Sequence, residues 1–432
     1  MNFTLKPIID NRSPMRVCVV DNLGGSYLPI ALHLSKHFQK VYFHSVSQSA
    51  FPKLATSKVG TGYSQITVLE SFWDHLDSFD IIVFTDLYFS DWGFQLRKMG
   101  KLVWGGSPSD VLETNRRLFK NELNNCGMAV APTKYIKGLS ALKLYLRDQK
   151  DKWIKVSYFR GEMETTKHTN YHQNALLFDD LTYHMGPLAE ELNFLVEDSI
   201  PSIAELGTDG WCIDGKMTNG MIWGLEVKDS CYIGKTTTYK DVPSCLNEVN
   251  NLFAPVLAKY KHRGFYSTEV RVGEDGKNYY TDICARAGSP PSNTYMNLIS
   301  NWADIIIEGC QGKLVEPKFI AKYGVEIILK SGSVVENFLP LFYDPKYEAN
   351  INLKGAFKLN GATYIIPFKY AGYALTEFGS VVVVGDNLEN IMTQALTIAK
   401  SIEGPDVTYD AQALENGMET LKRVESALTI LF

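Results

Sequence analysis

The chain has 432 residues, of which 45% are hydrophobic and 21% charged, and its formal net charge is −5. This length exceeds what a single hydrophobic core usually serves, so roughly two to four domains are expected. An ordinary globular composition without a basic excess argues against a general nucleic-acid-binding or anionic-membrane-binding surface.

Cysteine usage and hydropathy bear on the compartment. The seven cysteines are scattered and include no Cys-x-x-Cys pair, so neither a disulfide framework nor a zinc site is predicted. The opening residues lack the apolar core of a secretory signal, and no apolar run reaches the length of a membrane span. We therefore expect a soluble, cytoplasmic protein with reduced thiols.

Short apolar runs alternate with helical patterns through the first hundred residues. Strands separated by helices predict a doubly wound parallel sheet over residues 1–105, whose ligands would lie beyond the carboxyl ends of the strands. The predicted strands are Met15–Val20, Val41–His44, Ile81–Thr85 and Lys101–Trp104, and the first predicted helix is Tyr27–Phe38.

After residue 105 the sequence pattern changes from alternating strands and helices to one helix followed by a strand-rich stretch. One helix is predicted from Pro108 to Cys126, closed by Gly127. From Lys152 to about Gln311 the pattern is rich in strands, including a hairpin over residues 265–284 that turns at Asp275-Gly276.

The last hundred residues return to β-type runs followed by two helical patterns, Leu388–Ile402 and Ala411–Leu428. This organisation predicts three domains, at residues 1–105, 106–320 and 321–432, with a lid subdomain at about 130–200.

The predicted hairpin carries the polar residues that are most informative about chemistry. Strand alternation puts Glu269 on one face of the first strand, and puts Asp282 on the face of Tyr280 and Cys284 in the second. Two carboxylates on paired strands can hold a hard divalent cation, and Arg286 nearby can meet a phosphate or a carboxylate. The alternative is a solvent-facing hairpin whose charges have no ligand.

The run from Asp282 to Pro291 resembles the Glu-x-Asn-x-Arg-x-Gly-Asp-Pro-Glu signature of the ATP-grasp superfamily, most closely that of phosphoribosylamine–glycine ligases. The positions that match are Asp282, Arg286, Gly288 and Pro290, and the positions that depart are Cys284, Ser289 and Pro291. The resemblance spans nearly the whole chain. It implies a pre-ATP-grasp parallel sheet, an ATP-grasp fold and a small C-terminal α+β domain.

The same resemblance implies a set of nucleotide-binding residues. Arg116 stands where the family has its first nucleotide-contacting Lys, and Lys155 stands on the strand whose Lys contacts phosphates. Glu197, in the hinge, and Glu205 would contact the adenosine, while Glu269 and Asp282 would hold the metal. The alternatives are an exposed helix face for Arg116 and an edge-strand position for Lys155.

Other positions would complete the site. Lys228 is expected at the phosphates, and Gly24-Gly25 resembles the turn that binds the ribose phosphate of the amine substrate. Arg160-Gly161-Glu162 falls where the phosphate-covering loop of the family lies.

The reaction that the resemblance implies is ATP-dependent joining of a carboxylate to an amine through an acylphosphate, with Mg²⁺ or Mn²⁺. Arg286 and Lys228 would be catalytic, and Arg286 would also bind substrate. The substrates would be small molecules, nucleotide-like or amino acids. Two alternatives remain open: another ATP-grasp chemistry, carboxylating or kinase-like, and a non-catalytic nucleotide-binding protein.

Overall fold

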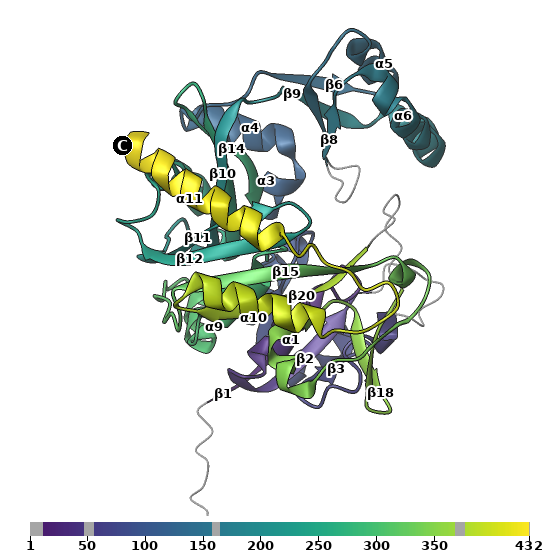
Figure 1. Cartoon of the computed structure of the whole chain (residues 1–432), viewed down its shortest axis with the longest axis vertical. Coiled ribbons are helices and arrows are strands. Elements are labelled where there is room, and N and C mark those ends of the chain that lie inside the picture. The colour runs from purple at the N-terminus through teal and green to yellow at the C-terminus, as the bar shows by residue number, and fades with distance from the viewer. Residues whose placement is uncertain (1–11, 47–55, 158–164, 368–375, 432) are drawn as a thin grey trace, which may run out of the picture.

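The computed structural model describes residues 12–46, 56–157, 165–367 and 376–431. Within these ranges the strands form four sheets, and the overall arrangement is seen in Figure 1.

The N-terminal sheet confirms the predicted parallel, doubly wound arrangement. Its order is β3-β2-β1-β4-β5, and all neighbours are parallel. The strand order reverses between β1 and β4, the position at which sheets of this type usually bind ligands. Its strands are β1 (Ser13–Asp21), β2 (Phe38–Ser45), β3 (Thr67–Val68), β4 (Ile81–Phe84) and β5 (Leu102–Trp104), with helices α1 (Leu28–Leu34) and α2 (Ser90–Lys98).

The first predicted helix is too long, since α1 ends at Leu34 and the chain enters β2 at Phe38. The helix predicted from Pro108 to Cys126 is two helices, α3 (Asp110–Thr114) and α4 (Arg116–Asn125). Asn115 leaves the helical conformation between them, and its side chain accepts a hydrogen bond from the Leu118 amide (3.1 Å). This N-cap starts α4 in a new direction.

The lid region, residues 133–198, stands apart at the top of Figure 1 and has a hydrophobic core of its own. Its sheet has the order β6-β9-β7-β8, so β7 lies between two neighbours and the edge-strand alternative for Lys155 is wrong. Its elements are β6 (Thr133–Lys137), α5 (Leu139–Leu146), β7 (Lys152–Val156), β8 (Thr165–His168), α6 (Tyr171–Met185) and β9 (Asn193–Asp198).

The largest sheet is antiparallel throughout and has the order β14-β13-β10-β11-β12-β15-β20-β17. It includes the predicted hairpin as β13 and β14. The sheet continues across residue 320 because β12 pairs with β15. Its strands are β10 (Ser202–Ile213), β11 (Gly220–Val227), β12 (Cys231–Thr238), β13 (Arg263–Gly273), β14 (Asn278–Cys284), β15 (Tyr323–Ser331), β17 (Ile351–Leu353) and β20 (Thr376–Gly385).

Helices α10 and α11, drawn in yellow in Figure 1, run across this sheet and contact β15. The helices after residue 200 are α7 (Ser244–Lys259), α8 (Ser292–Leu298), α9 (Trp302–Cys310), α10 (Leu388–Lys400) and α11 (Ala413–Leu431). A three-stranded sheet contains β16 (Leu339–Leu341), β18 (Ala356–Leu359) and β19 (Ala362–Ile365). The 3₁₀ turns are η1 (Thr56–Lys58), η2 (Trp73–Ser78), η3 (Gly186–Glu190), η4 (Ser333–Val335) and η5 (Pro345–Asn350).

A β-bulge corrects one prediction about the hairpin. Glu269 pairs with Asp282, but the next residue, Val270, pairs with Tyr280, so Thr281 is an extra residue on β14. The bulge places Tyr280 on the buried face of Val270 and leaves Asp282 on the face of Glu269. The predicted shared face of Asp282 and Tyr280 is therefore wrong.

Tyr280 instead joins an aromatic cluster that fixes α4 against the large sheet. Its ring lies edge-on to Phe119 of α4 (centroids 5.2 Å apart) and to Phe253 of α7 (5.1 Å). Its hydroxyl is 2.9 Å from that of Tyr266. Such edge-to-face pairs add specific geometry to the burial of apolar area, and here they hold the helix that carries Arg116.

Of the helices in the described ranges, none combines the length and the hydropathy that crossing a bilayer requires.

Phe253→Ala tests the importance of this cluster. The Phe253 side chain is completely buried, so its removal should cost about 3–5 kcal/mol of unfolding free energy. Its neighbour Leu252 is 37% exposed, and Leu252→Ala should cost about 1 kcal/mol or less. Thermal unfolding of both variants compares them, and equal losses would show that the cluster has no special role.

Candidate nucleotide and substrate cleft

A single large cleft collects most of the residues that the sequence predicts. Its volume is about 1070 Å³, slightly above the range of roughly 300–1,000 Å³ that is usual for small-molecule sites. The cleft is lined by α4, the lid region, the large sheet, the loop after β14 and the C-terminal part. The predicted residues in its lining are Arg116, Lys155, Glu197, Glu205, Lys228, Glu269, Asp282 and Arg286.

Five of the lining side chains form an ion-pair cluster that joins four elements. Asp282 of β14 pairs with Arg116 of α4 (2.5 Å) and with Lys155 of β7 (2.7 Å). Glu197 of β9 pairs with Lys155 (3.2 Å) and with Lys120 of α4 (2.7 Å). The lid region is therefore tied to α4 and to β14 through charges.

Burial makes these pairings obligatory. The Arg116, Lys120, Lys155 and Glu197 side chains are each less than a tenth exposed, and a buried charge without a partner is strongly unfavourable. Burial alone would raise the pKa of Asp282, but Lys155 and Arg116 outweigh it and hold that pKa well below its ordinary value. Likewise, Lys155 and Lys120 outweigh the effect of burial on Glu197 and lower its pKa. Three cations thus meet two carboxylates, an arrangement suited to a polyanionic ligand.

Next to this cluster, two carboxyl groups lie in direct contact. Burial, followed by the Glu205 side chain, raises the pKa of Glu269 far above its ordinary value. Glu205 also accepts a hydrogen bond from Arg271 Nε (2.7 Å). Two adjacent carboxylates disfavour each other's ionised form, and this repulsion adds to burial in raising the pKa of Glu269.

These groups can accept a divalent cation, although no cluster of three or more His, Cys, Asp or Glu side chains with metal-binding geometry occurs in the described ranges. Glu269 and Asp282 are cross-strand partners that both line the cleft. Hard cations prefer carboxylate oxygens, and a cation at Glu269 would offset the repulsion between the carboxylates of Glu269 and Glu205. The donor set therefore fits Mg²⁺ or Mn²⁺, provided that Asp282 exchanges its ion pairs.

Lys228 lies on the open side of the cleft. Its side chain is 76% exposed, and its ammonium lies 3.7 Å from Glu226. The carboxylates around it, Glu226 first, raise the pKa of Lys228, while burial raises the pKa of Glu226 to about 7. An exposed, charged lysine at this place can reach a bound phosphate.

Arg286 is held firmly by the N-terminal half of the chain. Its Nε donates to Glu113 of α3 (2.9 Å) and lies 3.6 Å from Asp86, which follows β4. Glu113 also accepts the Ala285 amide (2.7 Å), and the Tyr27 hydroxyl donates to the Ala287 carbonyl (2.9 Å). The guanidinium is thereby fixed at the wall of the cleft.

The turn at Gly24-Gly25 lies outside the lining of the cleft. The Gly25 amide already has an acidic partner, since Asp21 accepts it (2.6 Å) together with the Tyr27 amide (3.3 Å). Gly25 has a φ of +94°, and a Cβ there would lie 2.5 Å from the Val59 side chain. Packing and the Asp21 contacts account for this turn, and a substrate anion would have to displace Asp21.

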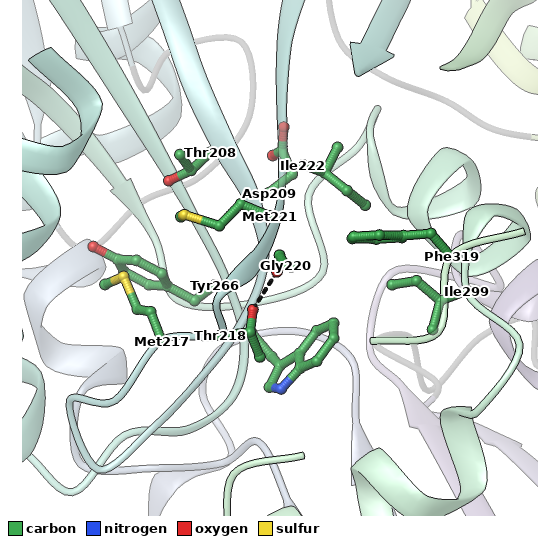
Figure 2. A pocket seen from close by; sticks show the side chains of 12 residues that line it. Thr208, Asp209, Met217, Thr218, Gly220, Met221, Ile222, Tyr266, Ile299 and Phe319 are labelled. Atoms are coloured by element: carbon green, nitrogen blue, oxygen red, sulfur yellow. Dashed lines mark hydrogen bonds between the residues drawn. The ribbon is translucent and has the colours of Figure 1, made fainter. Parts of the chain in front are cut away.

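Two further features bear on the predicted site. The segment Arg160-Gly161-Glu162 lies outside the residues that the structure describes. A second cavity, of about 20 Å³, borders Asp209 and Met221 and is shown in Figure 2. That volume holds about one water molecule and no substrate.

Lys120 is a site residue that the predicted set omits. It lies four residues after Arg116 on α4, and residues at this spacing share a helix face. The helical spacing therefore carried a usable signal for Lys120. Glu113 and Asp86 carried no such signal, because they meet Arg286 only through the tertiary fold.

No protein-family model matches the chain, and no curated protein matches it in sequence. Solved structures with the same architecture are nevertheless found. The biotin carboxylase domain of Hydrogenobacter thermophilus 2-oxoglutarate carboxylase, in complex with MgADP and bicarbonate, aligns with a TM-score of 0.62 at 10% identity, over 95% of this chain and 99% of that chain. N5-carboxyaminoimidazole ribonucleotide synthetase from Thermotoga maritima aligns with a TM-score of 0.56 at 13% identity, over 91% and 99%.

The fold is thus that of the ATP-grasp enzymes, as the resemblance in sequence implied. Phosphoribosylamine–glycine ligase from Thermotoga maritima has this architecture as well. It aligns with a TM-score of 0.69 at 14% identity, over 92% of this chain and 99% of that chain.

Asp21 makes stability depend on pH in a predictable direction. Burial raises its pKa from 3.8 to about 6, so its ionisation costs the folded state free energy. The stabilising contribution of Asp21 is greatest below about pH 4 and is lost as the pH rises through about 6. Relative to wild type, Asp21→Asn should gain about 1 kcal/mol or more between about pH 4.5 and about pH 7.

Thermal unfolding across this pH range measures the effect. Asp74→Asn, which changes an exposed carboxylate in the same N-terminal part, is the matched control and should follow wild type. Parallel curves for Asp21→Asn and wild type would contradict the assignment.

Proposed function

We propose that this protein is an ATP-dependent ligase that joins a small carboxylic acid to an amine through an acylphosphate. The observation that carries the proposal is the buried cluster of Arg116, Lys120, Lys155, Glu197 and Asp282. It lies beside the Glu205–Glu269 pair in a cleft large enough for more than one ligand.

In this proposal the nucleotide lies between the lid region and the large sheet. Lys155 and Arg116 would exchange Asp282 for the phosphates, since both are already arranged around an anion. Glu197 and Glu205 would face the adenosine. Because Glu197 holds Lys120 and Lys155 in place, its contribution to phosphate binding is also one of positioning.

A divalent cation, Mg²⁺ or Mn²⁺, would neutralise the charge that develops during phosphoryl transfer. Glu269 and Asp282 are the residues that would hold it. Asp282 would become available to the cation when Arg116 and Lys155 bind the phosphates instead.

Arg286 and Lys228 would act on the substrates. The contacts of Arg286 with Glu113 and Asp86 fix its planar guanidinium, which suits it to orienting a carboxylate or an acylphosphate. Lys228, exposed and charged, would contact the transferred phosphoryl group. Closure of the lid region would exclude water, which would otherwise hydrolyse the acylphosphate.

The similar structures support this class of reaction, since their names describe a phosphoribosylamine–glycine ligase and a carboxylase bound to MgADP and bicarbonate. A nucleotide-like or amino-acid substrate and a cytoplasmic location belong to the proposal. The altered signature residues Cys284, Ser289 and Pro291 favour a substrate pair of this protein's own.

Nucleotide binding is the direct test. Calorimetry with a non-hydrolysable ATP analogue should show binding that Mg²⁺ strengthens. Asp282→Asn should abolish the effect of Mg²⁺, because it removes a metal ligand. Lys155→Gln should weaken nucleotide binding about tenfold or more, because it removes a charge-assisted contact to phosphate.

The control is Asp179→Asn, an exposed carboxylate on the lid helix α6, which should bind as wild type does. Absence of nucleotide binding by wild type would refute the proposal. Once binding is established, hydrolysis of ATP that requires an acid and an amine together separates a ligase from a carboxylating, kinase-like or non-catalytic protein.

A further inference from the structure

A pair of histidines lies outside the cleft, at the end of the first helix. His33 is in the last turn of α1, and His37 follows directly before β2 begins. Neither residue belongs to the lining of the cleft. Helix α1 lies in the lower half of Figure 1, far from the lid region. The two histidines therefore take no part in the proposed ligase site.

The backbone brings both imidazoles to one side of the chain. The Lys36 amide donates to the His33 carbonyl (3.0 Å), so the chain keeps a helical course beyond α1. Residues four apart on such a course share a face. The His37 carbonyl in turn accepts the Ser13 amide (2.8 Å) at the start of β1. The pair is consequently held by α1 on one side and by the N-terminal sheet on the other.

The separation of the two ring nitrogens is that of a chelate. Nε2 of His33 and Nε2 of His37 lie 3.2 Å apart, and the ring planes are inclined by 32°. A zinc ion binds an imidazole nitrogen at about 2.0–2.1 Å. At that distance from one ion, two nitrogens 3.2 Å apart subtend about 100° at the ion, between the square-planar and tetrahedral angles. Small ring rotations are enough to aim both lone pairs at one point.

The protonation state of the pair also suits a metal ion. Burial, ahead of the charge of Lys36, lowers the pKa of His37 to about 4 and that of His33 well below its ordinary value. Both rings are then neutral at neutral pH, which is the form that binds metal. Neither Nδ1 atom makes a hydrogen bond with a residue that the structure describes. The proton between the two Nε2 atoms can therefore move to Nδ1, and both Nε2 lone pairs become available.

We propose that His33 and His37 together bind a divalent transition-metal ion such as Zn²⁺, with water as its remaining ligands, at a site separate from the cleft. Imidazole nitrogens favour Zn²⁺, Cu²⁺ and Ni²⁺, whereas Mg²⁺ prefers oxygen ligands. The ion would join the last turn of α1 to the entry of β2. An ion that binds only the folded state stabilises it by mass action. This inference goes beyond the proposed ligase function and does not depend on it.

Lys36 is the charge that opposes a cation at this place. It lies between the two histidines in the sequence and is exposed to solvent, so its repulsion is screened. Its removal gives the proposal a direction that a merely structural role of the histidines would not produce. Lys36→Gln should tighten the binding of Zn²⁺ about twofold.

The test is a calorimetric titration of Zn²⁺ into the full chain, with the cysteines kept reduced and with excess Mg²⁺ to occupy the carboxylates of the cleft. Wild type should bind Zn²⁺ saturably. His33→Gln and His37→Gln should each weaken this binding about tenfold or more, because a chelate becomes a single ligand. Zn²⁺ should also raise the unfolding temperature of wild type and leave that of the double variant unchanged.

His184→Gln is the matched control. His184 is exposed and likewise lies in the last turn of a helix, α6, but its ring is beside Tyr183 and not beside a second histidine. Thermal unfolding without metal verifies that each variant is folded. Absence of saturable Zn²⁺ binding by wild type overturns the inference. So does an affinity for Zn²⁺ that the double variant retains, or one that His184→Gln lowers as much.

Discussion

The balance of charge around Asp282 is the constraint on which the rest of the site depends. Its carboxylate joins Arg116 and Lys155, and through Lys155 it reaches Glu197. These groups come from α4, the lid region and β14, and none can move away without leaving a buried charge unpaired. In the proposed function an incoming anion would take the place of Asp282, so ligand binding would also change the contacts that position the lid region.

Local sequence patterns were sufficient for the elements whose periodicity is regular. Alternation of apolar runs and helices predicted the parallel N-terminal sheet, and the Asp-Gly turn predicted the β13–β14 hairpin. The same reasoning was wrong where one residue breaks the period. The extra residue Thr281 moves Tyr280 to the core, and Asn115 divides one predicted helix into two. The bulge depends on strand pairing that no window of sequence reveals. The break at Asn115 is local, since its side chain caps α4 at the Leu118 amide, and the capping preference of Asn carried a usable signal.

The candidate site likewise contains residues that the sequence predicted and residues that it did not. The resemblance to the ATP-grasp signature supplied Asp282, Arg286 and Lys155, which the structure brings to one cleft. Lys330, Lys354 and Arg423 also line the cleft, and they had no such signal because each residue taken singly is typical of a protein surface. Only the pairing of β15 with β20 and the course of α11 bring these side chains together.

The pairing of β12 with β15 has a consequence for how the gene can be divided. Because this ladder crosses residue 320, truncation there would remove β15 and expose the hydrogen-bonding groups of β12 along Cys231–Lys235. An uncovered strand edge of this kind recruits other chains and promotes aggregation. The segment before residue 320 is therefore a poor unit for separate expression.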